Sequence, residues 1–290
     1  MTAAKAGRYV LILLAGALIG LYAAGWAASR PFMAHIGPPP ASLDAEPVAV
    51  SSQSGSVIHG WFSNMPSPRG VVLLLPGVRA NRLSMVRRAQ FLRRAGYATL
   101  LIDFQATGES EGEAITFGWR ERFDVLAAVR YLNARMPGRA VGVIGVSLGG
   151  AATLFATPSL HVDAAVLEAV YPSIDRALVN RLETLVGPLG RIAAPLLLLQ
   201  LKPRLGVSPA DLKPVDRIAQ IECPLLIVAG TADRYTTMDD TRQLFAAARE
   251  PKELWTVEGA AHVDLFEFAG DAYRQRILAF FASAFMRTSG

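Results

Sequence analysis

Residues 141–150 constrain the fold of this chain more than any other stretch. They read Val-Gly-Val-Ile-Gly-Val-Ser-Leu-Gly-Gly, so a short apolar run stops at Ser147 and small residues come after it. The pattern predicts a buried strand, a sharp turn with Ser147 at its apex, and a helix. Gly145 and Gly149 suit such a turn because a Cβ at either place would clash. The turn is expected to hold Ser147 in a strained backbone conformation that exposes its hydroxyl.

The same Gly-x-Ser-x-Gly spacing occurs a second time, around Ser110. Residues 105–107 separate this serine from the apolar run before it, and the sequence after it continues to be polar. The two glutamates that flank the serine would also oppose formation of an alkoxide. We therefore predict that 105–113 is a polar loop and that Ser147 is the reactive serine.

From residue 71 onward, short apolar runs alternate with amphipathic segments. The runs predict strands at 71–75, 98–103, 141–146, 164–167, 225–229 and 253–257. Helices are expected near 82–95, 117–135 and 266–285, and two short strands near 48–51 and 57–62 open the domain. This alternation predicts an α/β fold with a doubly wound, mostly parallel sheet and helices on both faces. Ligands are then expected at the carboxyl ends of the strands.

The segment at about 172–210 interrupts the alternation, because it contains apolar helical material and no good strand. We predict a helical cap inserted over the active edge of the sheet, with an apolar face that packs on the sheet and shapes an acyl pocket. Its run at 195–201 is too short to span a membrane. A sharper alternative is a lid that opens toward a bilayer for lipid substrates.

The first 30 residues have the pattern of a membrane anchor. Lys5 and Arg8 precede an apolar stretch, residues 10–28, which at about 1.5 Å per residue crosses most of a hydrocarbon core about 30 Å thick. The stretch exceeds the apolar region of a typical signal peptide, although cleavage near the small residues 27–29 stays an alternative. The charges at its two ends predict a single-pass membrane protein with its N-terminus in the cytoplasm and the remainder on the extracytoplasmic side.

The rest of the chain divides into a linker at 31–45 and one domain at 46–290. The linker contains three consecutive prolines, residues 38–40, and is expected to be stiff and extended.

Charge and cysteine content argue against several other classes. Lys5, Arg8 and Arg30 supply +3 of the net charge of +5, which leaves +2 for the rest, and no basic run carries interleaved aromatic residues. We therefore expect no nucleic-acid partner. The single cysteine, Cys223, cannot form an intrachain disulfide and reads as a half-buried thiol. No Cys/His spacing suggests a metal site.

A serine hydroxyl needs a base to take its proton, and the chain has four histidines. His262 lies in the small-residue loop 259–262 directly after the last predicted strand, at the same carboxyl edge as Ser147. The other three fall in the linker, in an early strand and in a loop on the opposite edge (His35, His59 and His161). His262 is therefore the predicted base.

The base in turn needs an orienting acid. Asp233 directly follows a predicted strand and so lies at the same edge, and it gives the chain order Ser147, Asp233, His262. Glu168 and Asp175 are the alternatives, since they lie near the end of the preceding strand. Three other carboxylates read as helix caps or solvated groups: Asp239, Asp240 and Asp264.

Two backbone N–H groups should hold the negative oxygen that develops on the substrate. One belongs to Leu148, the residue after the serine. The other is expected in the loop after the strand at 71–75, where Gly77 permits a tight turn and Val78 N–H is the candidate.

These motifs together resemble the α/β-hydrolase superfamily, and most closely its bacterial single-domain esterases and serine aminopeptidase-like members. The resemblance covers about 46–285 and rests on the motifs at 73–77, 101–112, 145–150, 228–233 and 257–262, in that order. In similar proteins the loop that contains the Ser110 motif is a structural signature. The sequence departs from the common pattern at Pro76, where relatives usually have histidine, and at Gln105 and Ala106, which replace Arg-Gly.

The sequence thus predicts a serine hydrolase that cleaves small-molecule acyl esters without a cofactor or metal, with lipid-like esters as the leading substrates. A serine peptidase is the alternative among enzymes. It would need charged side chains in the pocket, for which Arg176, Arg181 and Arg191 are candidates. A catalytically silent, membrane-tethered binding domain is the alternative outside the enzymes, and the presence of all three triad residues disfavours it.

Overall fold

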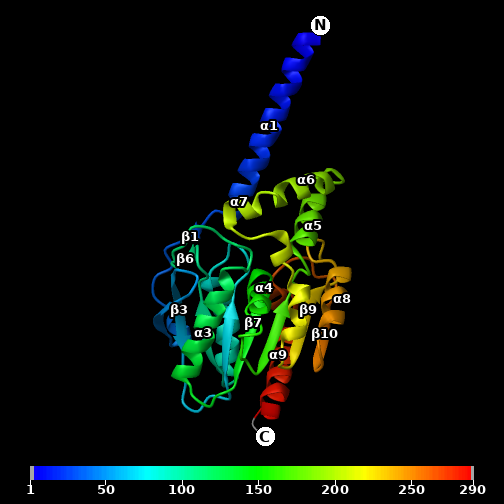
Figure 1. Cartoon of the computed structure of the whole chain (residues 1–290). Helices are drawn as coiled ribbons and strands as arrows, with labels where there is room; N and C mark the ends of the chain where they lie inside the picture. Colours follow the sequence, from blue (N-terminus) through cyan, green and yellow to red (C-terminus); the bar gives the residue numbers. More distant parts are fainter. Residues whose placement is uncertain (1–2, 289–290) are drawn as a thin grey trace.

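An eight-stranded sheet forms the centre of the structure, a computed structural model that describes residues 3–288 (Figure 1). Its strand order is β10-β9-β8-β7-β4-β5-β3-β2. The strands are β2 (Glu46–Ser51), β3 (Val57–Ser63), β4 (Val71–Leu75), β5 (Ala98–Ile102), β7 (Val141–Val146), β8 (Ala164–Glu168), β9 (Leu225–Gly230) and β10 (Lys252–Val257). Among these described strands, only β2 with β3 and β3 with β5 pair antiparallel. The predicted mostly parallel sheet is confirmed.

Helices cover both faces of this sheet. The helices are α2 (Val86–Arg94), α3 (Glu121–Arg135), α4 (Leu148–Phe155), α8 (Met238–Ala247) and α9 (Leu265–Thr288). On one face, α2 and α9 pack on strand residues such as Leu74 and Ile144. On the other, α3 and α4 pack on their neighbours Leu73 and Val143. Because successive strand residues meet helices on opposite faces, the central strands are apolar throughout.

Several helices begin or bend where the backbone leaves the helical region. The helix predicted at 117–135 starts only at Glu121, because Phe117 and Gly118 have φ values of 55° and 98°. The predicted helix at 82–95 is a 3₁₀ turn, η2 (Arg82–Met85), followed by α2. In α9 the backbone kinks at Gly270, where φ is 53°.

The predicted cap consists of three helices between β8 and β9. They are α5 (Ile174–Val186), α6 (Leu189–Leu198) and α7 (Leu201–Leu205). Three 3₁₀ turns lead from the cap to β9: η3 (Pro209–Asp211), η4 (Pro214–Asp216) and η5 (Ile218–Gln220). The cap lies at the end of the domain from which α1 projects, far from the C-terminus (Figure 1).

The segment 31–45, which the sequence predicts to be a linker, is held against the domain. Within it, β1 (Phe32–Met33) pairs in parallel with β6 (Thr107–Gly108), and η1 (Ala41–Leu43) buries Leu43 completely. The N–H groups of Ile36 and Gly37 donate to Glu109 Oε1 at 3.0 and 3.1 Å. The polar loop with the second Gly-x-Ser-x-Gly motif therefore serves as a dock for the linker.

Helix α1 (Ala3–Ser29) projects from the domain next to α6 and α7 (Figure 1). Its part Leu11–Ser29 is long and apolar enough to cross a membrane, and large apolar side chains such as Leu13 and Ile19 are exposed along it.

Candidate active site

Ser147 occupies a strained turn between β7 and α4. Its φ is 48° and its ψ is −105°, as predicted for the apex of such a turn, and the residue is half-buried. A Cβ at Gly145 would lie 2.6 Å from Gly150 N, and one at Gly149 would lie 2.5 Å from Leu75 O. The two glycines therefore allow the start of α4 to press against β4 and β7, which fixes the direction of the serine.

Asp233 and His262 form a hydrogen-bonded pair at the same edge of the sheet. The distance from Asp233 Oδ2 to His262 Nδ1 is 2.7 Å, and the aspartate side chain is 1% exposed against 26% for the histidine. The other carboxylate oxygen accepts the N–H groups of Tyr235 and Thr236 at 2.8 and 2.9 Å. Three hydrogen bonds thus fix the Asp233 carboxylate. The carboxylate in turn fixes the orientation of the His262 ring through Nδ1.

The loop after β4 lies against the serine turn. A Cβ at Gly77 would be 3.9 Å from Ser147 Cβ, an ordinary van der Waals distance, so the loop lies next to the serine and the approach does not require glycine there. Val78 comes next in this loop, and Leu148 opens α4, where helical N–H groups have no partner within the helix. Arg79 has a φ of 56° and donates from Nη1 to Ala27 O of α1 at 2.7 Å.

One cavity of about 460 Å³ brings these groups together. Ser147, His262, Val78 and Leu148 all line it. Most of its remaining wall is apolar and comes from the cap and from the last turns of α1. Its charged lining side chains are Arg79, Arg181 and Arg204, and the described lining residues include no Asp or Glu. Such a cavity suits an apolar chain with a carbonyl placed at the serine.

Of the three arginines considered for a peptide terminus, only Arg181 lines this cavity, where its guanidinium lies 4.6 Å from the ring centre of Tyr235. Arg176 pairs with Asp240 at 2.9 Å, and Arg191 pairs with Glu183.

Glu168, the alternative acid, belongs to a different cluster. Its carboxylate binds Arg88 Nη2 at 2.8 Å and accepts the hydroxyl of Tyr273, and all three side chains are almost completely buried. Arg88 also binds Asp264, two residues after His262. The backbone O of Glu168 accepts the N–H of Ser147 at 2.7 Å. This cluster therefore connects the loop that contains His262 to the turn at Ser147, through Asp264 and Glu168 respectively.

The other carboxylates mostly cap helices, as predicted. Asp240 forms a capping box with Thr237 at the start of α8, and Asp264 accepts the N–H of Phe266 at the start of α9. Asp239 is exposed and pairs with Arg242. Asp175, the second alternative acid, lies in the first turn of α5.

Ser110 is completely buried and fully engaged. Its hydroxyl donates to Asp103 O at 2.8 Å and accepts the N–H of His59 at 2.9 Å. These contacts tie the polar loop to β3, which agrees with the predicted structural role of this second motif.

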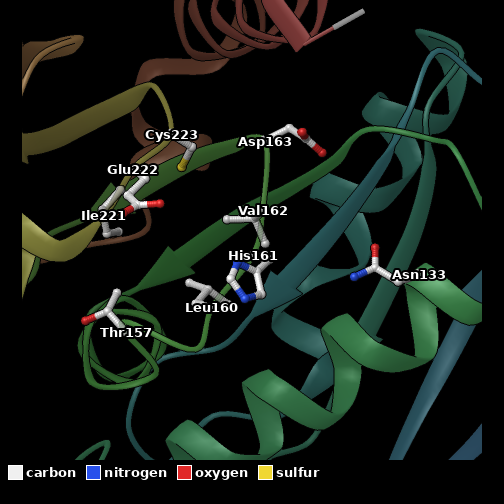
Figure 2. A pocket seen from close by; sticks show the side chains of 9 residues that line it. All are labelled: Asn133, Thr157, Leu160, His161, Val162, Asp163, Ile221, Glu222 and Cys223. Carbon is white, nitrogen blue, oxygen red and sulfur yellow. The ribbon is translucent and has the colours of Figure 1, made fainter.

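His161 lies at the opposite edge of the sheet, as expected. Figure 2 shows it in a separate cavity of about 300 Å³ together with Asn133 and Cys223. The loops around this cavity precede β8 and β9, whereas Ser147 comes after β7. Burial raises the pKa of the Cys223 thiol to about 12, which disfavours the thiolate near neutral pH. Among residues 3–288, no group of three His, Cys, Asp or Glu side chains is arranged to hold a metal ion.

Sequence reasoning missed several residues at the site. Tyr235 packs edge-on against the His262 ring at 5.4 Å, and the buried Tyr171 lines the cavity and donates its hydroxyl to Phe117 O at 2.7 Å. Tyr235 could have been suspected from its position two residues after Asp233. The contribution of α1 to the cavity had no signal in the sequence.

Comparisons with known proteins identify a family for the chain. The sequence model of the Alpha/beta hydrolase family matches residues 59–276. The chain is 30% identical over 259 residues to the YfhR protein of Salmonella typhi, which covers 86% of this chain and 84% of that protein. It is also 30% identical over 254 residues to the alpha/beta hydrolase domain-containing protein WAV2 of Arabidopsis thaliana, covering 82% and 79%.

Solved structures support the same fold. An esterase of Pyrococcus furiosus superposes with a TM-score of 0.74 and 20% identity, over 88% of this chain and 98% of the esterase. An esterase of Exiguobacterium antarcticum superposes with a TM-score of 0.60 and 16% identity, over 81% and 99%.

Proposed function

Because the chain belongs to the alpha/beta hydrolase family, we propose that it is a serine hydrolase that cleaves carboxylic acyl esters. The observations that carry the proposal are the 2.7 Å contact between Asp233 and His262 and the cavity that His262 and Ser147 both line at the carboxyl edge of the sheet. Serine, aspartate and histidine in this chain order are typical of the family's chemistry.

In this reaction His262 takes the proton of Ser147 Oγ while the oxygen attacks the ester carbonyl. The carbonyl oxygen becomes negative and accepts the N–H groups of Leu148 and Val78. The C–O bond to the alcohol then breaks, and the alcohol leaves with the proton from His262. Water attacks the acyl-serine in the second half, gives its proton to His262, and the acid is released as the serine recovers that proton. Asp233 stabilises the charged imidazole throughout.

Turnover of a short, soluble ester such as p-nitrophenyl butyrate tests the assignment. We expect Ser147→Ala and His262→Ala to lower kcat/KM by at least about 10³-fold, and Asp233→Asn by about 10²–10⁴-fold, because each removes a group that acts in the transition state. Ser110→Ala is the matched control, since it removes the serine of the same motif from a site with structural contacts. If wild type hydrolyses neither short nor long acyl esters, the catalytically silent binding domain becomes the better account.

The peptidase alternative is separated by substrate. An aminopeptidase must bind a substrate ammonium group, and an acidic side chain is the usual partner for it. The described lining residues of the cavity include none, and much of the wall is apolar, which favours acyl esters. Faster turnover of amino-acid p-nitroanilides than of p-nitrophenyl esters would reverse this preference.

We also propose that residues 1–30 anchor the protein as a single-pass membrane protein, with the linker at 31–45 and the domain at 46–290 on the extracytoplasmic side. The apolar helix α1 and the excess of positive charge before it support this topology. The contacts of the last turns of α1 with the domain favour a retained helix over a cleaved signal. Resistance to alkaline carbonate extraction, an intact N-terminal sequence, and digestion of the domain by protease added from outside are the expected results. A mature N-terminus near residue 30 would contradict the anchor.

A further inference from the structure

The anchor helix forms part of the wall of the active-site cavity. The cavity lining includes five residues from the last two turns of α1: Ala24, Gly25, Ala27, Ala28 and Ser29. Leu197, Leu198 and Leu201 of the cap line the same cavity, and Ser147 and His262 line it as well. A substrate in this cavity would therefore touch the helix that is proposed to cross the membrane.

Specific contacts join α1 to the cap; we call this contact region the seam. Gln200 Nε2 donates to Leu21 O at 3.0 Å, and Arg204 Nη2 donates to Ser29 Oγ at 3.0 Å. A Cβ at Gly25 would lie 2.4 Å from Gln200 Oε1, so the glycine allows the cap to approach the helix closely. Together with Arg79 and the docked linker, these contacts fix the base of α1 on the domain.

The length of α1 leaves no gap between the cap and a bilayer. Gln200 of the cap contacts α1 at Leu21, and the described side chains of residues 11–20 are exposed. Residues 11–20 are the part of the apolar span before this contact, and at about 1.5 Å per residue they are about 15 Å long. A hydrocarbon core is about 30 Å thick, so a helix that crosses it must draw the cap against the membrane surface.

The cap has an apolar face suited to that position. Six large apolar side chains, which we call the cap row, are between 47% and 73% exposed: Leu185, Val186, Leu189, Ile192, Leu196 and Leu199. From Leu189 onward they recur every three or four residues, which places them on one side of α6, while Gly190, Ala194 and Leu198 on the other side are buried. Figure 1 shows α6 lying crosswise near the base of α1, as a helix in the plane of a membrane surface would lie.

We propose that the cap row lies in the membrane leaflet that faces the domain, around the end of α1, and that the enzyme takes its acyl ester from this leaflet by way of the contact between α1 and α6. The substrate class is then a bilayer-resident ester with a long acyl chain, whose chain lies against α1 and the cap while its carbonyl reaches Ser147. This inference rests on the proposed serine hydrolase and on the proposed anchor.

The test compares two substrates with the full-length protein reconstituted in phosphatidylcholine vesicles. One is p-nitrophenyl butyrate, which reaches the site from water, and the other is 4-methylumbelliferyl oleate carried in the vesicles. In the double variant Ile192→Glu/Leu199→Glu, two residues of the cap row that do not line the cavity become charged. We expect oleate turnover to fall at least tenfold and butyrate turnover to stay within twofold of wild type.

Met286→Glu is the matched control, because Met286 is 72% exposed near the end of α9, at the opposite end of the molecule from α1 (Figure 1). It should leave both rates unchanged. Wild-type turnover of oleate by the double variant, with butyrate turnover intact, would overturn the inference while leaving the serine hydrolase in place. If the wild-type protein turned over neither ester, the proposed function itself would be refuted. A change in oligomeric mass in detergent with unchanged substrate selectivity would assign the cap row to a second copy of the chain, and so overturn the inference.

A second comparison tests the helix wall itself. Gly25→Leu places a side chain in the seam, whereas Gly20→Leu points into space with no neighbour within 4 Å. In detergent, Gly25→Leu should lower the ratio of oleate to butyrate turnover at least fivefold, and Gly20→Leu should leave it unchanged. Equal ratios in the two variants would show that α1 does not contact the acyl chain.

Discussion

At the scale of single residues, the same Gly-x-Ser-x-Gly spacing occurs in two different turns. Around Ser147, the flanking glycines allow the start of α4 to pack closely against the neighbouring strands. Around Ser110, a Cβ at Gly108 would lie 2.3 Å from Asp103 Cγ, so that glycine closes the polar loop around a buried carboxylate. The sequence distinguishes the two turns because a continuous apolar strand leads directly into Ser147 and none leads directly into Ser110.

The strain at Ser147 gives a prediction for stability. A non-glycine residue at a φ of 48° is expected to cost about 1–3 kcal/mol, and glycine relieves that cost. Ser147→Gly should therefore be about 1 kcal/mol more stable than Ser147→Ala in chemical denaturation, with both variants inactive. At an ordinary helical position the order of glycine and alanine is reversed. Equal stabilities, or a more stable alanine variant, would show that the turn is not strained.

Arg88 is expected to position the loop of His262 without itself lining the cavity. Arg88→Met leaves Glu168 without its buried cation, which should lower the free energy of unfolding by about 3–5 kcal/mol and also lower kcat, because Arg88 holds the loop of His262 through Asp264. The neighbouring Arg87 pairs with Glu267 at the surface, so Arg87→Met should change stability by less than about 1 kcal/mol. Urea denaturation and ester turnover measure both effects. Equal effects of the two substitutions would contradict this role.

At the scale of elements, α3 carries a buried acid that makes stability depend on pH. Burial raises the pKa of Asp124 from its ordinary value of 3.8 to about 7, although Gln105 N–H and the Ser52 hydroxyl donate to its carboxylate. Between about pH 4 and pH 7 the unfolded chain loses this proton while the folded chain keeps it. Rising pH therefore favours unfolding in this window, by up to about 1.4 kcal/mol per pH unit.

Asp124→Asn should remove this dependence, because the amide does not titrate. Thermal unfolding at several pH values between 4 and 7 measures it, and the wild type should lose stability relative to the variant as the pH rises. A difference between the two proteins that is constant over the window, or that grows in the opposite direction, would show that the carboxyl is ionised in the folded state.

At the scale of the whole molecule, periodicity and motif order predicted the sheet, the helices on both faces, the cap and the apolar N-terminal helix. They did so because each depends on a local pattern in the sequence. The docking of residues 31–45 and the contribution of α1 to the cavity depend on contacts between segments far apart, such as Gln200 with Leu21. Such contacts leave no periodic signal, since a single side chain or a backbone N–H makes them.

In the candidate site, too, residues that follow a local pattern could be predicted and contacts between distant segments could not. Ser147, Asp233 and His262 could be predicted because each lies just after a strand, and parallel strands bring the residues at their carboxyl ends to one edge of the sheet. The cluster of Arg88, Glu168 and Tyr273 could not, because its members come from a helix, a strand and a second helix with no common motif. Their burial was visible only once the layers were assembled.

Locating the covalent adduct of a fluorophosphonate probe by peptide mass spectrometry tests the central claim most directly. The probe reacts with a serine only where a base activates it and donors hold the resulting charge. We predict an adduct on Ser147 in the wild-type protein, and none in Ser147→Ala or in wild type denatured before labelling. An adduct on Ser110, or labelling that survives Ser147→Ala, would contradict the assignment of Ser147 as the nucleophile.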